Sequence, residues 1–200
     1  MIETRPRLRH GAVLLAAGAS RRLGRPKQTV LVDGEPLVAR FAGLALATDP
    51  RALIISLGAQ AAAVRRALGD PGDDPRVRCV EATDWTAGMG ASLRAGLDAL
   101  PDDCDAALVL LCDQPALTVA HLDRLLAAWR VDPARASASA YAGVLGVPAV
   151  LPRAWWPAVD AGSDRGARDL LRARAAGVSA VAAAGLERDL DTPADLDPLS

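Results

Sequence analysis

A short apolar run near the start of the chain is followed by a loop that contains two glycines and several cationic side chains. The run is A-V-L-L at residues 12–15, and the segment from Leu15 to Lys27 reads L-A-A-G-A-S-R-R-L-G-R-P-K. Glycine and other small residues let the backbone approach a ligand closely, with N–H groups free to donate hydrogen bonds. Arg22 and Lys27 add positive charge to the same loop. A strand, a tight loop and fixed cations together predict a polyphosphate site.

This loop matches neither of the two common phosphate-binding motifs. A Walker loop requires G-x-x-x-x-G-K-[S/T]. Here Gly18 and Gly24 are too far apart, and Gln28 follows the lysine. The dinucleotide fingerprint G-x-G-x-x-G is absent as well.

An acidic residue follows a second apolar run, Ala106–Leu111. The segment at residues 110–115 reads L-L-C-D-Q-P, so Asp113 stands at the end of a predicted buried strand and Pro115 fixes the exit of the loop. A carboxylate is a hard oxygen ligand suited to Mg²⁺. The alternative interpretation is a solvated aspartate at a strand end.

Two glycines also precede a predicted helix over Ser92–Leu100. The segment at residues 88–96 reads G-M-G-A-S-L-R-A-G, which puts Ser92 in the expected N-cap region. Such a start can present backbone N–H groups and a hydroxyl to a ligand. A plain capped helix after a flexible loop is the alternative.

Strand-like and helix-like runs alternate along the chain. The expected strands are 12–16, 51–57, 77–80, 106–111, 137–141, 147–151 and 179–183, and the expected helices are 36–47, 60–68, 92–100, 119–130 and 165–175. This alternation predicts parallel βαβ units, and the continuous apolar strands predict a sheet covered on both faces. Because ligands bind beyond the carboxyl ends of such strands, the loops after Leu15 and Leu111 should lie along one rim.

Composition predicts a single domain over residues 1–200. Hydrophobic residues make up 51% of the chain, enough for a sizeable core, and the net charge is −1, so no global field favours nucleic acid or an anionic membrane. Cys79, Cys104 and Cys112 form no C-x-x-C pair, which predicts reduced cysteines in a cytoplasmic protein. His10 and His121 match no zinc spacing. Cys112 has no evident histidine partner and is interpreted as a packing residue.

Taken together, the motifs resemble those of the MobA-like nucleotidyltransferase superfamily, and within it the molybdenum cofactor cytidylyltransferases. The first loop is similar to L-A-A-G-x-S-x-R-[L/M]-G-x-P-K, C-D-Q-P to the acidic motif, and G-M-x-x-S-L-x-x-G to the segment beside the base and ribose. The resemblance runs from Ala12 to Leu196. It implies a Rossmann-like three-layer α/β/α sandwich with a mostly parallel sheet, of the nucleotide-diphospho-sugar transferase type.

The resemblance also implies roles for individual residues. The implied catalytic residues are Lys27, Arg22 and Asp113. The implied nucleotide-binding residues are Leu15, Ala16, Ala17, Gly18, Lys27, Gly88, Gly90, Ser92 and Asp113. The implied acceptor-binding residues are Gln114, Gly146, Pro148, Arg165 and Arg168, although Val147 stands where the family often has His. The implied Mg²⁺ ligands are Asp113 and Asp191, with Asp189 as the runner-up to Asp191.

Two of these assignments have structural alternatives. Arg165 and Arg168 fit equally well as exposed charges at a helix start. The terminal D-x-D-T-P-x-D-like segment fits a helix cap without any catalytic part.

The implied reaction is Mg²⁺-dependent transfer of CMP from CTP to a phosphomonoester, Mo-molybdopterin, which releases pyrophosphate and forms molybdopterin cytosine dinucleotide. The implied partners are the nucleotide, a molybdopterin-type acceptor, and a molybdenum hydroxylase or its maturation factor. Four alternatives remain. They are a GTP-using enzyme, another small-molecule nucleotidyltransferase, a superfamily oxidoreductase acting on a heteroaromatic substrate, and a non-catalytic maturation partner of a molybdenum hydroxylase.

Overall fold

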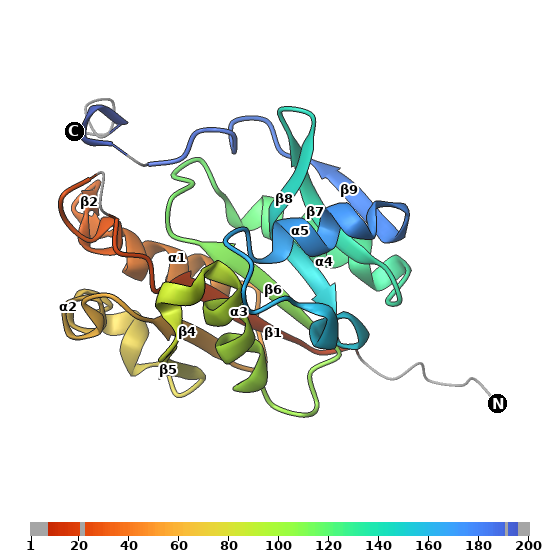
Figure 1. The fold of residues 1–200 in the computed structure, drawn as a ribbon, viewed down its shortest axis with the longest axis horizontal. Coiled ribbons are helices and arrows are strands. Elements are labelled where there is room, and N and C mark those ends of the chain that lie inside the picture. The colour runs from red at the N-terminus through yellow and green to blue at the C-terminus, as the bar shows by residue number, and fades with distance from the viewer. Residues whose placement is uncertain (1–7, 21–22, 191, 196–200) are drawn as a thin grey trace.

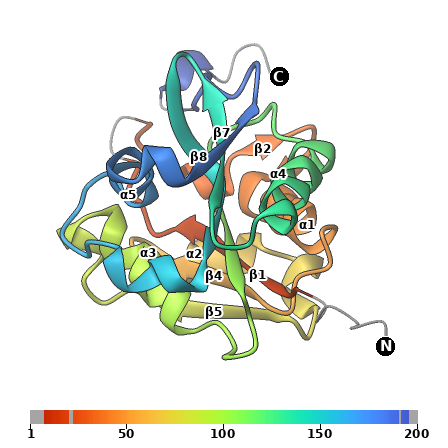
Figure 2. The same ribbon diagram turned by 90° about the vertical axis from the view of Figure 1, so that its right-hand side faces the viewer.

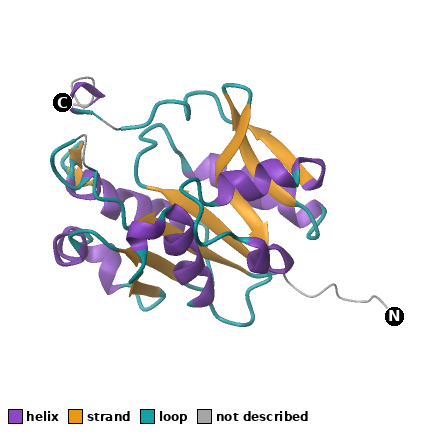
Figure 3. Cartoon of the chain, in the orientation of Figure 1, coloured by secondary structure: helices purple, strands orange, loops and turns teal. Residues whose placement is uncertain are grey.

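A seven-stranded sheet forms the middle layer of the protein, and helices cover both of its faces (Figures 1 and 3). The computed structural model describes residues 8–20, 23–190 and 192–195. The strands are β1 (His10–Ala16), β4 (Leu53–Leu57), β5 (Val77–Glu81), β6 (Ala106–Leu111), β7 (Ala136–Tyr141), β8 (Val144–Pro152) and β9 (Val178–Ala182). The helices are α1 (Leu37–Leu46), α2 (Ala61–Ala67), α3 (Met89–Asp98), α4 (Val119–Val131) and α5 (Ala167–Ala173).

The strand order is β5-β4-β1-β6-β8-β7-β9. β1 pairs in parallel with β4 and β6, β4 with β5, and β7 with β9, whereas β8 runs antiparallel to both β6 and β7. The predicted three-layer sandwich with a mostly parallel sheet is therefore confirmed. The carboxyl ends of β1, β4 and β6 lie together on one edge, which is called the carboxyl rim below.

The core consists of two apolar layers, one on each face of the sheet. Alternate residues of a strand enter opposite layers, so Leu14 packs in one layer and Val13 in the other. α1 and α4 cover the first layer and α3 and α5 cover the second, as Figure 2 shows end-on. Strands buried on both faces need no polar alternation, which is why they read as continuous apolar runs.

Two hairpins depart from the sequence prediction. The short strands β2 (Leu31–Val32) and β3 (Glu35–Pro36) were not expected; Asp33 and Gly34 between them have φ values of 54° and 81°. An Asp-Gly pair at positive φ is the usual two-residue hairpin turn. β8 begins at Val144, three residues before the predicted start, because Ala142 and Gly143 form a similar turn after β7.

Helix α3 begins at Met89, not at Ser92 as the sequence predicted. Gly88 precedes the helix with φ of 131°, a conformation that L side chains rarely adopt. Ser92 is therefore inside the first turn, and it is not the N-cap. In the part of the chain that the structure describes, no helix combines the length and the apolar character needed to cross a bilayer.

Candidate active site

The loop after β1 and the loop after β6 meet at the carboxyl rim. Lys27 Nζ donates a hydrogen bond to Asp113 Oδ2 at 2.9 Å, and the two side chains are only 17% and 14% exposed. Lys27 is also the only lysine of the chain; every other cationic side chain apart from the histidines is an arginine. The structure thus brings together the predicted cation and the predicted acid from segments 86 residues apart.

Gln28 and Ser20 hold Lys27 in place. The backbone N–H of Lys27 donates to Ser20 Oγ at 3.0 Å. The Gln28 amide nitrogen donates to the carbonyl oxygens of Ala16 and Gly18 at 2.9 and 3.0 Å, and the side chain is 2% exposed. Both donors of the amide are used to brace the small-residue loop, so the loop that carries Lys27 has a defined shape.

A cavity of about 450 Å³ lies over this pair. Seven of the sixteen residues that the sequence assigned to the site line it: Leu15, Ala17, Gly18, Lys27, Gly88, Ser92 and Asp113. Nine further residues line it that the sequence did not assign: Ala19, Ser20, Gln28, Trp85, Thr86, Met89, Leu111, Cys112 and Asp164. Arg22 and Asp191 lie outside the described residues.

Trp85 forms an apolar wall of this cavity, and Gly58 at the end of β4 makes that possible. A Cβ on Gly58 would lie 2.7 Å from Trp85 Cγ and 2.8 Å from both the methyl and the carbonyl oxygen of Ala17. Real Cβ atoms do not approach that closely, so only glycine lets the indole pack against the first loop. Nothing in the sequence around Trp85 signals this contact, because it depends on a glycine 27 positions earlier.

Gly90 serves packing between α3 and a neighbouring loop. A Cβ on Gly90 would clash with the carbonyl oxygen of Asp160, and the Gly90 N–H donates to the Ser163 carbonyl oxygen at 2.8 Å. Arg165 and Arg168 follow in the same region, but both are exposed and neither lines the cavity. Asp164 is the residue of this loop that does.

Ala16 and the remaining predicted acceptor-binding residues, Gln114, Gly146 and Pro148, also lie outside the cavity lining. Ala16 is fully buried and its carbonyl oxygen accepts from Gln28. Gly146 packs against Tyr141, whose hydroxyl a Cβ would strike. The Pro148 carbonyl oxygen accepts from Ser139 Oγ at 2.7 Å within the sheet.

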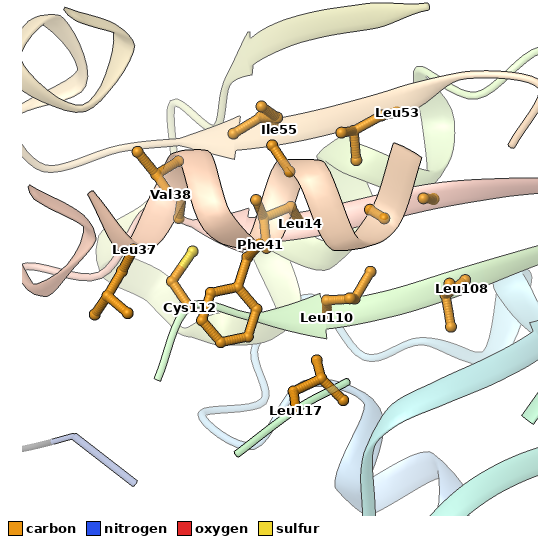
Figure 4. Packing of buried hydrophobic residues seen from close by; sticks show 14 of the residues in the cluster. Leu14, Leu37, Val38, Phe41, Leu53, Ile55, Leu108, Leu110, Cys112 and Leu117 are labelled. Carbon is orange, nitrogen blue, oxygen red and sulfur yellow. The ribbon is translucent and has the colours of Figure 1, made fainter. Parts of the chain in front are cut away.

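Cys112 lines the cavity but has no nucleophilic character. It is 3% exposed and belongs to the same apolar cluster as Phe41 and Leu110 (Figure 4). Burial raises the pKa of the Cys112 thiol, and the adjacent Asp113 carboxylate raises it further. The thiol stays protonated, in agreement with the interpretation as a packing residue. All three cysteines are free thiols in this structure.

The Asp113 carboxylate has one oxygen that suits a hard cation. Oδ2 accepts from Lys27, whereas Oδ1 is buried without a hydrogen-bond partner. The backbone N–H of Leu190 donates to the Asp113 carbonyl oxygen at 2.8 Å, which brings the segment around Asp189 to the same place. Within residues 8–20, 23–190 and 192–195, no group of three His, Cys, Asp or Glu side chains forms a metal site. Asp189 precedes Leu190 in the sequence and Asp191 follows it, so either could supply a second acidic ligand.

A second hollow, of about 510 Å³, lies at the opposite edge of the sheet. Its lining includes Arg9, Arg51 and Arg76, each of which forms an ion pair with a neighbouring aspartate. It lies at the amino ends of β1 and β4, where parallel sheets do not bind ligands. The cavity at the carboxyl rim is therefore the candidate active site.

The sequence and the fold are similar to those of known proteins. A family model for the MobA-like NTP transferase domain matches residues 12–179. The chain is 41% identical over 172 residues to the nicotine blue oxidoreductase of Paenarthrobacter nicotinovorans, covering 80% of each protein. It is 31% identical over 135 residues to the molybdenum cofactor guanylyltransferase of Rhodobacter capsulatus, covering 62% of this chain and 70% of that one.

Among solved structures, the chain is similar to Rv0371c from Mycobacterium tuberculosis H37Rv. The TM-score is 0.80 at 26% identity, with 96% of this chain and 97% of that one covered. A further structure of Rv0371c is a complex with manganese, with a TM-score of 0.69.

Proposed function

The chain belongs to the MobA-like NTP transferase domain family, and from that premise we propose that it transfers CMP from CTP to a phosphomonoester, Mo-molybdopterin. The observation that carries the proposal is the Lys27–Asp113 pair at the carboxyl rim, under a cavity walled by a small-residue loop. The products are molybdopterin cytosine dinucleotide and pyrophosphate. The consumer of such a dinucleotide is a molybdenum hydroxylase or its maturation factor.

The reaction asks for positioning and charge neutralisation more than for covalent chemistry. An oxygen of the acceptor phosphate forms a bond to the α-phosphorus of CTP while the bond from that phosphorus to the pyrophosphate oxygen breaks. The acceptor phosphate is already ionised near neutral pH, so no general base is needed. Lys27 and Arg22 stabilise the negative charge on the triphosphate. The backbone of the loop braced by Gln28 holds the nucleotide in line with the acceptor.

A divalent cation fits the residues around Asp113. Asp113 Oδ1 is a buried, unpaired carboxylate oxygen, and a hard cation takes such oxygens as ligands. Asp113 and Asp191 would hold it, with Asp189 as the alternative to Asp191. Bound there, Mg²⁺ would supply neutralisation of phosphate charge.

The methyl group of Ala17 supports CTP as the nucleotide. Ala17 lines the cavity on the first loop. A side chain at this position crowds a purine more than a pyrimidine. We expect CTP to be preferred over GTP when both are present at equal concentration. The test is incubation with Mg²⁺, molybdopterin and each nucleoside triphosphate, followed by mass spectrometry of the dinucleotide. A preference for GTP would refute the cytidylyl assignment and leave nucleotidyl transfer intact.

A second candidate function is reduction of a heteroaromatic substrate. The observation that favours it is the 41% identity to nicotine blue oxidoreductase, together with the apolar wall of Trp85 and Met89 in the cavity. Stoichiometric oxidation of NADH or NADPH by such a substrate, without any dinucleotide product, would establish this function in place of the first.

A further inference from the structure

Gln114 lies directly after the candidate metal ligand Asp113 but does not reach the cavity. Its side chain is 1% exposed, and it is absent from the residues that line the cavity. Its position in the C-D-Q-P motif predicted contact with the acceptor. Because the Gln114 side chain is buried away from the cavity, its role must be other than contact with the acceptor.

The Gln114 amide nitrogen joins two distant parts of the chain. Nε2 donates to the Leu186 carbonyl oxygen at 3.0 Å and to the Val147 carbonyl oxygen at 3.2 Å. The Tyr141 hydroxyl lies 3.5 Å from Nε2, at the limit of a hydrogen bond. Oε1 is buried without a partner. An unpaired buried carbonyl oxygen is unfavourable, so the favourable contribution of this side chain comes from the hydrogen bonds that Nε2 donates.

The segment that Gln114 holds is the one that leads to the terminal acidic residues. β9 is separated from β6 by β7 and β8, so residues 183–190 must cross the carboxyl rim to return to Asp113. Figure 1 shows this segment in blue, leading from β9 past the hairpin of β7 and β8 toward the C-terminus. Leu186 and Leu190 are each 3% exposed, and the Leu190 N–H donates to the Asp113 carbonyl oxygen. Asp189 and Asp191 flank Leu190 in the sequence.

We propose that Gln114 is a positioning residue, whose amide fastens residues 183–190 against the backbone of Asp113 and so fixes the carboxylate that holds the cation. The inference rests on the proposed function, which places a divalent cation at Asp113. Gln114 then has a role in the geometry of the metal site and none in recognition of the acceptor or of the nucleotide base. Outer-shell hydrogen bonds of this kind commonly change metal affinity by about 10- to 100-fold.

The test uses the full chain and Mn²⁺ alone. Gln114→Met keeps the length of the side chain and removes both donors, and Gln114→Asn keeps the amide but shortens its reach. Mn²⁺ affinity is measured by electron paramagnetic resonance, and amide hydrogen exchange is followed for residues 184–190. Tyr141→Phe is the matched control, because it removes the neighbouring hydroxyl and leaves the Leu186 bond intact. Ser139→Ala controls for a general loss of stability.

We expect at least a tenfold weaker Mn²⁺ affinity and faster exchange of residues 184–190 in both Gln114 variants, with both controls within twofold of the unsubstituted protein. Mn²⁺ affinity within twofold of the unsubstituted protein in either folded Gln114 variant would overturn the proposal, and so would an unsubstituted protein that binds no Mn²⁺. Neither measurement needs CTP or molybdopterin. If no dinucleotide forms but Gln114→Met still loses Mn²⁺, the proposed reaction fails and the positioning role stands.

Discussion

Replacing Lys27 gives a large loss of activity with a modest loss of stability. Its ammonium lies 2.9 Å from Asp113, and at an effective dielectric constant of about 20 two unit charges at that distance attract by roughly 6 kcal/mol. Desolvation of both groups offsets most of this attraction. For side chains that are mostly but not fully buried, loss of one partner costs about 1–3 kcal/mol. A domain with about 5–15 kcal/mol of stability stays folded, and its Tm falls by about 2–4 °C per kcal/mol.

The catalytic loss should be larger than the loss of stability. A fixed cation at a developing phosphate charge contributes about 10²- to 10³-fold in rate, which equals about 2.7–4 kcal/mol. We therefore expect Lys27→Met to reduce dinucleotide formation from CTP and molybdopterin by two to three powers of ten. Lys27→Arg should recover less than a tenth of the lost activity, because the planar guanidinium is wider than the ammonium and bonds in a fixed fork.

The assay compares initial rates by mass spectrometry with Tm from calorimetry on the same samples. Arg66→Met, which removes an exposed cation on α2, is the matched control. Because Lys27 is the only lysine, an amine-selective acylating reagent gives an independent readout: bound CTP should protect this one side chain from modification. A folded Lys27→Met variant with a rate within threefold of the unsubstituted protein would refute contact between Lys27 and the triphosphate.

Three other predictions concern the metal, the cavity wall and the dependence of stability on pH. Asp113→Asn should abolish Mn²⁺ binding measured by electron paramagnetic resonance; unchanged affinity would place the cation elsewhere. CTP should quench the fluorescence of Trp85, and a Trp85→Phe variant that keeps the whole quench would contradict contact between CTP and this ring. Gly58→Ala should raise the KM for CTP about tenfold, because the added Cβ would lie 2.7 Å from Trp85 Cγ and displace the ring. Burial, aided by the charge of Arg130, lowers the pKa of His10 from 6.5 to about 4. Between these values the unfolded chain binds a proton that the folded chain does not, so the free energy of unfolding should fall as pH drops from 6.5 toward 4, by at most about 3 kcal/mol. His10→Gln should flatten this dependence in denaturant titrations, and an equally steep dependence would show that other groups cause it.

The sequence predicted the structure correctly wherever a local pattern of residues determines the type of an element. The apolar runs at Ala106–Leu111 and 51–57 predicted buried strands, because a strand covered on both faces has no polar side to alternate with. The convergence of Lys27 and Asp113 followed from the rule that parallel strands present their carboxyl ends together. Both expectations needed only the type of each element and its direction.

The remaining features depend on contacts between distant segments. Trp85 lines the cavity because Gly58 makes room for it, and Gln114 is buried because the segment carrying Leu186 returns from β9. Neither partner can be identified from the residues next to Trp85 or Gln114. The predicted start of α3 at Ser92 was wrong for a related reason. Gly88 and Gly90 accommodate the loop at residues 160–164, and that packing moves the start of the helix to Met89.

The order of the strands has a consequence for how this fold diversifies. Among the described residues that line the cavity, all except Asp164 lie between Leu15 and Asp113. The strands beyond β6 in the sheet, namely β8, β7 and β9, all come from later in the chain. Substitutions after residue 113 can therefore reshape the far side of the carboxyl rim without disturbing the loop around Lys27. In this architecture the first half of the sheet can therefore stay constant while the second half varies.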